Sequence, residues 1–576
     1  MAAALMARFA LVATAFVIIG WMLPAPGGPA PVSAATVTFV VNSAADAHDA
    51  HPGGGKCADR AGRCTLRAAV EAADAEPAGT SVSITVPAGK YLLTLGSLDL
   101  TGNTIAITGA GSAAIGITGT SSTIVQAKGS FRVMGVGAAA TATLSKVTIT
   151  GGNAGNSGYG GGVYNAGKLT VRLCAISRNK AVAGGGLANA GGTLTVIGST
   201  VTGNHAPYYG GGGIQNGGLK NLPGVVTVTD STVDGNTSGG DGGGILNGQN
   251  GHPASARSAA VSVRPGCPRL RRCASGLGRL AAGRPPTAGL KLTVAGTQFD
   301  GNTSGNAGGA IANDGGVAVV TTSTLSGNSA GAGIGGGIQA FGSLTVDLST
   351  ITANRADYGG GIEAYDGHVA VPSTATIEQS TLSGNTAGIG AGIDDGSIVT
   401  VTADTLAANK AGQGGGIEVE GATVNVLNST LSGNVGGGID TYACGGGTVG
   451  YTTFDANSPD LSLSCSTLRL TGTIVAGKAS ATNCAGSAPS ETVGYNLDSG
   501  TSCRFTNSTD LTKTNALLGP LADNGGPTMT QTLRRGSPAI NHGGSRATGC
   551  PATDQRGLSR PFGPACDTGS VEVRYK

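Results

Sequence analysis

The sequence predicts an all-β fold, a right-handed parallel β-helix that winds as a solenoid of about 25 residues per coil. The main evidence is a formula that recurs between residues about 140 and 460: L-x-V, two residues, S-T-aliphatic, two residues, Asn, a short polar run and G-G-G-I. Composition agrees, because glycine contributes 104 of 576 residues, aromatics 4 % and charged residues 12 %. That mixture excludes an ordinary helical or α/β domain, and the glycines are clustered rather than placed at every third position, which excludes collagen.

The spacing of the marker asparagine sets the length of one coil. Successive markers lie 23–32 residues apart, except for one interval of 66. Three short β segments in each such unit fit a solenoid better than a propeller or a leucine-rich repeat. The markers are Asn153, Asn179, Asn204, Asn236, Asn302, Asn328, Asn354, Asn385, Asn409, Asn434 and Asn457.

The formula has a local physical explanation. Leu and Val of L-x-V point inward on either side of an outward residue, and the aliphatic residue after S-T points inward again. We expect Asn to adopt left-handed backbone at the turn and to bond the Asn of the next coil. The triple glycine permits a sharp turn without a Cβ clash.

Residues 1–35 are predicted to be a signal peptide. Arg8 precedes an apolar run, Phe9 to Leu23, and a plausible cleavage site lies near Ala34. The apolar run is shorter than the roughly 20 residues that span a bilayer. An exported protein with eleven cysteines is expected to form disulfides. Proximity suggests the pairs Cys57/Cys64, Cys444/Cys465, Cys484/Cys503 and Cys550/Cys566.

Residues 36–79 are predicted to close the open N-terminal end of the solenoid. They begin with a strand-like run, Val37 to Val41. Leu66, Val70 and Ala73 follow at helical spacing, and Thr65 is placed to cap that helix. A short helix at this point would cover the apolar end of the first coil.

Residues 80–479 are predicted to form the β-helix, with an insertion at 251–289 that accounts for the long interval. The insertion holds seven arginines, five prolines and no acid. It is interpreted as a basic loop for an anionic polymer, as an irregular surface insertion, or as a segment translated out of frame. Residues 480–576 leave the formula, are richer in cysteine and turn signals, and are predicted to be a separate C-terminal β-rich module or the cap of the other end.

Three stretches resemble known families. Cys64-Thr65-Leu66-Arg67-Ala68-Ala69 resembles the motif of the CSLREA domain. The middle resembles right-handed parallel β-helix (pectin lyase-like) proteins and the repeats of polymorphic outer-membrane proteins. The C-terminal stretch is similar to the choice-of-anchor Q domain, on Gly525-Gly526-Pro527-Thr528, Gly536-Ser537-Pro538-Ala539-Ile540, Asp554-Gln555-Arg556-Gly557, Arg560-Pro561 and Cys566-Asp567. The resemblance implies an exported surface or secreted protein and no established activity.

Candidate chemistry lies in the slot after each G-G-G-I isoleucine, which is predicted to point outward. Its four last members are Glu363, Asp394, Glu418 and Asp440, about 4.8 Å apart on successive coils. Three interpretations remain open. Asp394, Glu418 and Asp440 could hold Ca²⁺; a pair could act as acid and nucleophile in glycoside cleavage; or the column is a solvated acidic stripe. Lyase chemistry needs a facing base, and Arg355 and Lys410 are predicted to lie on another face.

Other columns are interpreted as structural. The threonine before each aliphatic residue is predicted to face outward, and an ice-binding role is weighed against ordinary strand pairing. The preceding serine is predicted to face inward, and Cys174 takes that slot as a small buried filler. The second asparagine series is expected to form a structural ladder: Asn165, Asn189, Asn216, Asn247 and Asn313.

These patterns predict a secreted or cell-surface protein, monomeric, that serves without catalysis as an adhesin-like or polysaccharide-binding scaffold. Its expected partner is an extracellular polysaccharide or a cell-surface component. A net charge of +3 gives no reason to expect nucleic acid. The alternative is a polysaccharide lyase or glycoside hydrolase using the stacked carboxylates, with calcium as the only cofactor considered. Sugar clefts usually contain stacking rings, and only Tyr358, Tyr365 and Tyr442 are near the column.

Overall fold

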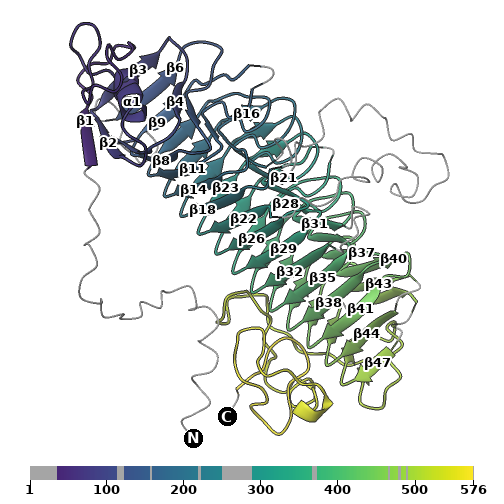
Figure 1. The fold of residues 1–576 in the computed structure, drawn as a ribbon. Coiled ribbons are helices and arrows are strands. Elements are labelled where there is room, and N and C mark those ends of the chain that lie inside the picture. Colours follow the sequence, from purple (N-terminus) through teal and green to yellow (C-terminus); the bar gives the residue numbers. More distant parts are fainter. Residues whose placement is uncertain are drawn as a thin grey trace, which may run out of the picture.

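The computed structural model describes residues 36–112, 122–155, 158–217, 222–248, 289–331, 333–365, 373–464, 467–477, 482–487, 489 and 491–574. The expected signal peptide (1–35) and nearly all of the insertion (251–288) lie outside the described residues. Within them the chain forms one α-helix, one 3-10 helix and long sheets whose strands pair in parallel. This is the right-handed parallel β-helix that the repeat predicts, drawn out along one axis (Figure 1).

Each complete coil contributes one strand to each of three sheets, in the order sheet 2, sheet 1, sheet 3. Sheet 1 consists of β1 (Thr36–Val40), β2 (Ser81–Val86), β5 (Thr104–Gly109), β8 (Thr141–Ser145), β11 (Lys168–Arg172), β14 (Thr193–Ile197), β18 (Val225–Thr229), β22 (Lys291–Ala295), β26 (Val317–Thr321), β29 (Ser343–Asp347), β32 (Thr374–Glu378), β35 (Ile398–Thr402), β38 (Thr423–Leu427), β41 (Gly446–Gly450), β44 (Thr467–Thr471) and β47 (Glu491–Gly494).

Sheet 2 carries the G-G-G-I segments. It consists of β4 (Leu98–Leu100), β7 (Met134–Val136), β10 (Val163–Asn165), β13 (Leu187–Asn189), β17 (Ile214–Asn216), β21 (Ile245–Gly248), β25 (Ile311–Asp314), β28 (Ile338–Ala340), β31 (Ile362–Tyr365), β34 (Ile393–Gly396), β37 (Ile417–Glu420), β40 (Ile439–Tyr442), β43 (Leu461–Leu463) and β46 (Cys484–Gly486).

Sheet 3 carries the S-T-aliphatic segments. It consists of β3 (Gly89–Leu93), β6 (Thr123–Ala127), β9 (Thr148–Thr150), β12 (Ala175–Ser177), β15 (Thr200–Thr202), β19 (Thr232–Asp234), β23 (Gln298–Asp300), β27 (Thr324–Ser326), β30 (Thr350–Thr352), β33 (Thr381–Ser383), β36 (Thr405–Ala407), β39 (Thr430–Ser432), β42 (Thr453–Asp455), β45 (Ile474–Ala476), β48 (Leu497–Asp498) and β49 (Leu511–Thr512). A small fourth sheet joins β16 (His205–Ala206), β20 (Thr237–Ser238) and β24 (Thr303–Ser304).

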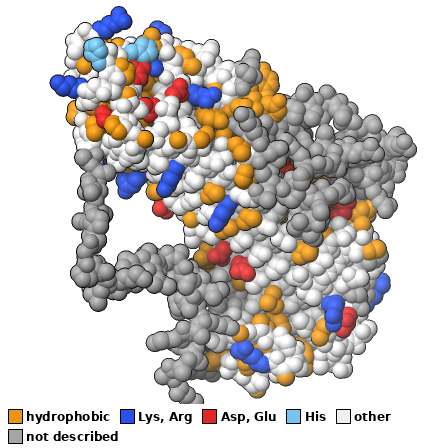
Figure 2. Space-filling model, in the orientation of Figure 1, with side chains coloured by type: hydrophobic (Ala, Val, Ile, Leu, Met, Phe, Trp, Pro, Cys, Tyr) orange, Lys and Arg blue, Asp and Glu red, His pale blue; other side chains and the backbone are white. Residues whose placement is uncertain are grey.

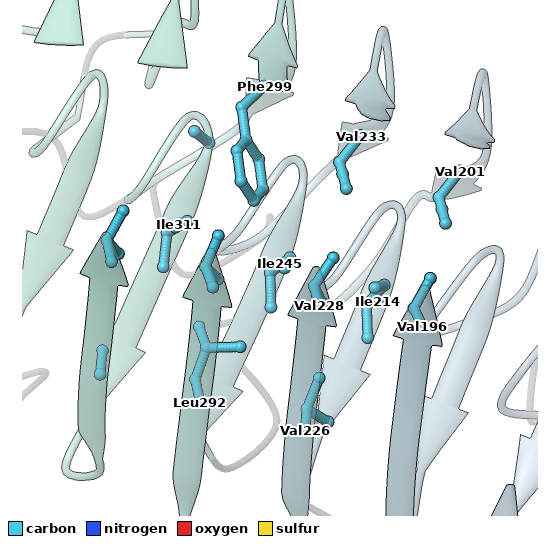
Figure 3. Close-up of a cluster of buried hydrophobic side chains, with 14 of the residues drawn as sticks. Val196, Val201, Ile214, Val226, Val228, Val233, Ile245, Leu292, Phe299 and Ile311 are labelled. Carbon is cyan, nitrogen blue, oxygen red and sulfur yellow. The ribbon is translucent and has the colours of Figure 1, made fainter. Parts of the chain in front are cut away.

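The core is a stack of aliphatic layers, one from each coil. Val226 and Val228 of β18, Val233 of β19 and Ile245 of β21 are buried and converge from three sheets (Figure 3). Their strands pair in register with those of the next coil, so each residue stacks on an equivalent residue. Burial of such side chains contributes roughly 25 cal/mol per Å² of apolar surface. The inward positions predicted from L-x-V and S-T-aliphatic are therefore confirmed.

The marker asparagines form a buried ladder along the inside of one corner. The Nδ2 of Asn354 donates to the Oδ1 of Asn385 at 3.0 Å and to the Leu325 carbonyl at 3.0 Å. The prediction of left-handed backbone at the asparagine was wrong. The residue before it takes that conformation, as Ala353 does with φ of 55°. The turn at that residue aligns the asparagine for the ladder. The second series, including Asn165 and Asn189, forms the predicted ladder as well.

The N-terminal segment forms the predicted helix, α1 (Leu66–Asp74). The Oγ1 of Thr65 accepts a bond from the N–H of Ala68 and caps it. Arg67 and Asp46 form a buried ion pair at 2.7 Å, and Arg67 also donates to the carbonyls of Gly96 and Ser97. Burial, the largest single influence, would raise the pKa of the Asp46 carboxyl, but the bonds from Arg67 and from the N–H groups of Thr94 and Leu95 lower it overall. The arginine of the CSLREA-like motif thus joins the helix to the first coils.

The chain after β49 leaves the solenoid and folds back along sheet 3. In Figure 1 this segment, drawn in yellow and including η2 (Arg546–Thr548), lies beside the later coils. The parallel sheets continue to Thr512 and so run past residue 479, where the sequence placed the boundary. Asn428 Nδ2 donates to the Thr553 carbonyl and Tyr451 donates to the Gly543 carbonyl, which ties residues 513–574 to the solenoid. We call residues 513–574 the C-terminal segment.

Three of the four expected disulfides are present: Cys57–Cys64, Cys484–Cys503 and Cys550–Cys566. Cys465 of the fourth expected pair lies outside the described residues. Cys174 is a free cysteine, fully buried in the inward serine column, and burial raises its pKa to about 11. Disulfides of this kind are typical of extracellular proteins. No helix in the described part of the chain is long and apolar enough to cross a membrane.

Candidate functional site

The four predicted carboxylates lie in one column on sheet 2. Glu363 of β31 pairs in register with Asp394 of β34, Asp394 with Glu418 of β37, and Glu418 with Asp440 of β40. The isoleucine before each of them belongs to the core, as do Ala364 and Val419 after two of them, so alternation places the carboxylates on the other face of the sheet. We call Glu363, Asp394, Glu418 and Asp440 the acidic column. Neighbouring strands are about 4.8 Å apart, which sets the spacing of the Cα atoms.

Glycine turns bring the preceding loop close to this column. Gly359, Gly390 and Gly414 have φ near +60°. A Cβ on Gly390 would lie 2.4 Å from the Asp394 Cβ, and one on Gly414 would lie 2.6 Å from the Glu418 Cβ. Any other residue at these positions would displace the carboxylate or the turn. The first glycine of the triplet is therefore needed both for its backbone conformation and for its lack of a side chain.

The acidic column is shielded from solvent. The exposed fractions of Glu363, Asp394, Glu418 and Asp440 are 1, 1, 3 and 5 %. A solvated acidic stripe is therefore wrong as an interpretation of this slot. The sequence correctly indicates which face of the strand each residue occupies, but burial of an outward face depends on what packs over it. Carboxylates removed from water interact more strongly with charges and dipoles around them than exposed ones do.

A partly exposed row runs beside the acidic column, two residues further along each strand. It contains Phe341, Tyr365, Gly396, Glu420 and Tyr442, all half-buried. The rings of Phe341 and Tyr365 meet edge to face, 6.3 Å apart. A Cβ on Gly396 would lie 2.3 Å from the Tyr365 ring, so that ring extends across the neighbouring coil. We call these five residues the aromatic row. In a chain with only 4 % aromatic residues, three rings in one row are a local concentration.

The basic residues near the column in sequence belong to a different ladder. Arg355 pairs by isolated bridges with Ser329 and Thr386, and Thr386 pairs with Lys410. This ladder lies at the turn that precedes the glycine triplet and is separate from sheet 2, as the sequence indicated. No group of three or more His, Cys, Asp or Glu side chains within the described ranges is arranged to hold a metal ion. Calcium at Asp394, Glu418 and Asp440 remains a prediction without support from that finding.

Two further acids, Asp404 and Asp395, are buried in structural slots of the repeat. Asp404 replaces the inward serine of its coil and Asp395 takes the slot of the second asparagine ladder; both are fully buried. Burial raises the pKa of Asp404 well above its usual range. The Asp395 Oδ1 accepts the N–H of Ser397 at 2.8 Å. An acid in place of the Ser or Asn of the formula was the available signal.

The outward threonine column differs between coils. Thr200, Thr232 and Thr350 are half-buried, whereas Thr405, Thr430 and Thr453 are buried where the C-terminal segment covers sheet 3. Thr430 Oγ1 donates to the Gln555 Oε1 at 2.6 Å and Ser570 Oγ lies 3.0 Å from it. The later threonines are therefore part of an internal interface. On the face drawn in Figure 2, the charged side chains of the described residues are scattered and form no continuous basic or acidic patch.

Comparisons with known proteins bear on the fold. No protein-family model matches the chain, and no curated protein sequence matches it. Among solved structures it is similar to pectate lyase Pel9A, with 14 % identity, a TM-score of 0.24 and coverage of 94 % of this chain and 98 % of that one. It is also similar to the catalytic unit of a thermostable GH87 α-1,3-glucanase from Streptomyces thermodiastaticus strain HF3-3, with 14 % identity, a TM-score of 0.33 and coverage of 81 and 70 %. A GH87 α-1,3-glucanase catalytic domain in complex with nigerose gives 11 % identity, a TM-score of 0.27 and the same coverage.

Proposed function

We propose that this protein is an exported carbohydrate-active protein that binds a polysaccharide along sheet 2 and hydrolyses it with two carboxylates of the acidic column. The observation that carries the proposal is the register of Glu363, Asp394, Glu418 and Asp440 on four adjacent strands. A retaining glycosidase needs two carboxyl groups about 5 to 5.5 Å apart, and neighbouring strands provide close to that separation.

Asp394 and Glu418 are the pair to which we assign the chemistry. Each has an acid on the strand before it and on the strand after it, whereas Glu363 and Asp440 have an acid on one side only. A retaining hydrolysis requires a proton on one carboxyl group and a charge on its neighbour, and two adjacent strands hold such a pair side by side. Glu418, with the longer side chain, would donate the proton to the glycosidic oxygen, and Asp394 would attack the anomeric carbon.

Hydrolysis is favoured over elimination by the position of the basic residues. A lyase needs a base that faces the substrate next to the carboxylates. Arg355 and Lys410 lie on the ladder of isolated bridges at the preceding turn and not on sheet 2. The acidic column therefore supplies acid and nucleophile, which suits a hydrolase.

The aromatic row would bind the sugar chain. Tyr365 follows Glu363 by two residues on the same strand, and Tyr442 follows Asp440 in the same way, so the Cα atom of each tyrosine lies about 7 Å from that of an acid. Aromatic faces stack on the apolar faces of sugar rings and are common in such sites. A chain lying on the half-buried row would place its glycosidic oxygens beside the shielded carboxylates. Disulfide content supports an extracellular location.

The decisive experiment compares wild type with Glu418→Gln on a panel of neutral and acidic polysaccharides. Release of reducing ends and binding are measured on the same substrates. We expect Glu418→Gln to lower the rate of release about 10²- to 10⁴-fold, the usual contribution of a general acid, with binding preserved. Asp300→Asn is the matched control, because Asp300 is an exposed acid on sheet 3. Equal rates in Glu418→Gln and wild type would reject the assignment.

A second candidate is a polysaccharide-binding or adhesin-like surface without catalysis. The row offers only three rings, fewer than most sugar clefts contain, and this favours recognition over turnover. Wild type would then bind a polysaccharide of the panel and release no reducing ends from any of them. Tyr365→Ala should weaken such binding, and loss of binding in that variant would locate the surface on the aromatic row under either candidate.

A further inference from the structure

The inward serine column obeys one bonding rule in successive coils. Each hydroxyl donates to the carbonyl two residues before it and accepts the N–H of the equivalent residue in the previous coil. Ser349 Oγ donates to the Asp347 carbonyl at 2.8 Å, and Ser380 Oγ donates to the Glu378 carbonyl at 2.7 Å. Ser380 Oγ also accepts the Ser349 N–H at 3.0 Å. Every coil of this kind therefore uses one hydroxyl proton and one oxygen lone pair.

Asp404 occupies this column and can follow the rule only with a proton on its carboxyl group. Its Oδ1 accepts the N–H of Ser380 at 2.6 Å, as a serine oxygen would. Its Oδ2 is buried and has no hydrogen-bond partner. The carbonyl two residues before it, that of Thr402, is the acceptor that the rule assigns to this position. A neutral carboxyl group can donate to that carbonyl, whereas a carboxylate cannot.

Burial is the main influence that opposes ionisation of Asp404, and it outweighs backbone hydrogen bonds at Ser380 and Thr402 that act in the opposite direction on its pKa. The preceding coils face it with Glu378 and Asp347, both acids that add to the effect of burial on its pKa. The following coil contributes Ser429, whose Oγ accepts the Asp404 N–H at 3.2 Å. The C-terminal segment contributes Gln555. Neither of these two residues titrates, so within the described part of the chain no cation that contacts Asp404 offsets a negative charge there.

The same turn is where the C-terminal segment docks. Gln555 Nε2 donates to the Asp404 carbonyl at 2.9 Å and to the Thr405 Oγ1 at 3.1 Å. Thr405 donates to the Met529 carbonyl, and Thr528 Oγ1 donates to the Ala403 carbonyl at 3.0 Å. Residues 403–405 thus take part in both the serine column and the interface with the C-terminal segment.

We propose that Asp404 is a proton-controlled latch that holds the C-terminal segment on sheet 3. With its proton, Asp404 completes the serine column and residues 403–405 present their carbonyls and hydroxyl to Gln555, Thr528 and Met529. Without it, a buried negative charge faces the Thr402 carbonyl, residues 403–405 open to bring the charge to water, and the segment is released. Release would uncover Thr405, Thr430 and Thr453, a surface that the docked segment covers.

The sign of the pH dependence follows from linkage. A carboxyl group whose pKa is raised in the folded protein stabilises the closed state at low pH. That contribution is lost as pH rises through the folded pKa. Between the pKa of the opened state and the raised pKa of the closed state, the equilibrium constant for opening should rise about tenfold per pH unit, and above the raised pKa it should level off. Acid conditions therefore favour docking and alkaline conditions favour release.

The test is hydrogen–deuterium exchange of the full-length protein at about pH 5 and about pH 9. Wild type is compared with Asp404→Asn at each pH, which removes the intrinsic effect of pH on exchange. The asparagine amide donates to the Thr402 carbonyl at any pH and its oxygen still accepts from Ser380. At residues 403–407, 527–531 and 553–557 we expect the ratio of exchange in wild type to exchange in Asp404→Asn to be at least about tenfold higher at high pH than at low pH.

Two further variants keep the test decisive. Asp404→Ser restores the rule of the column and should behave like Asp404→Asn, which covers the case that the asparagine variant folds poorly. Gln555→Ala should loosen residues 527–531 equally at both pH values. An unchanged ratio of wild type to Asp404→Asn between the two pH values would overturn the latch. So would an equal rise in exchange at residues 323–326, because that result would indicate opening of the whole solenoid.

Discussion

The coils before residue 341 and those after residue 361 share one backbone and differ in one outward slot. Gly184 and Gly390 have the same left-handed conformation, and a Cβ on either would meet the Cβ of the slot residue, Ala188 in one case and Asp394 in the other. The coils that contribute β10 to β28 fill the slot with neutral residues, and the four coils that contribute β31 to β40 fill it with acids. The comparison teaches that the repeat determines the scaffold, whereas chemistry must be sought in positions that the repeat leaves free.

Sheet 3 shows a second difference between early and late coils. Thr350 and Thr430 hold the same position in the formula, yet Thr350 is half-buried and Thr430 is completely buried beneath the C-terminal segment. Its partner Gln555 is 125 residues away in the chain. Threonine at this one repeat position therefore has two roles. The two roles can be distinguished only by contacts with a segment that is distant in sequence.

The largest loss of stability should come from the asparagine ladder, which the early and the late coils share. Asn354→Ala and Asn204→Ala each remove an amide that bonds a carbonyl and two neighbouring asparagines of the ladder. Each change leaves buried donors and acceptors unsatisfied, and we expect each to lower the free energy of unfolding by about 3–5 kcal/mol. Denaturant unfolding measures both. Losses that differ between the two coils by more than about 1 kcal/mol would show that the ladder is not uniform.

Extending the acidic column into an early coil should have the next largest effect. Gln339 pairs in register with Glu363 and is buried, so Gln339→Glu places a fifth carboxylate beside the four. Repulsion at about 5 Å amounts to roughly 3 kcal/mol at an effective dielectric constant near 20. The resulting loss of stability should appear at neutral pH and diminish below about pH 4, where carboxylates become protonated.

Gln215→Glu is the control for that change. Its neighbours in register are Ala188 and Leu246, so it imposes the cost of a buried charge without an adjacent acid. The difference between the two variants in thermal unfolding at neutral pH isolates repulsion within the column. Equal decreases in the melting temperature of the two variants would mean that a partner of Glu363 already compensates its charge.

The fold could be predicted because every coil repeats the same local sequence pattern. Leu344 and Val346 alternate with Thr345, Thr65 caps α1, and nearby cysteines such as Cys57 and Cys64 are joined. The register of the acidic column followed from the same periodicity. Its burial did not, because periodicity gives the face of a strand and not what covers it.

What the sequence could not give depends on contacts between distant segments. Gln555 bonds the Asp404 carbonyl across 151 residues, and no local pattern near Asp404 indicates that docking. The replacement of serine by aspartate there was visible, but its meaning required knowledge that Ser380 and Ser429 lie directly before and after it in the column. Departures from a repeat are therefore worth marking in sequence, and their environment must come from structure.

The smallest effects should separate the two threonine environments on sheet 3. Thr430→Val removes a hydroxyl that donates to Gln555 at 2.6 Å in a buried interface and leaves the Gln555 oxygen without that donor. We expect a loss of about 1–2 kcal/mol in the free energy of unfolding. Thr350→Val makes the same chemical change on a half-buried strand position and should stay within about 0.5 kcal/mol, since valine suits a β-strand. Urea unfolding of both variants measures the difference, and equal values would mean that the hydrogen bond to Gln555 adds nothing to the docking of the C-terminal segment.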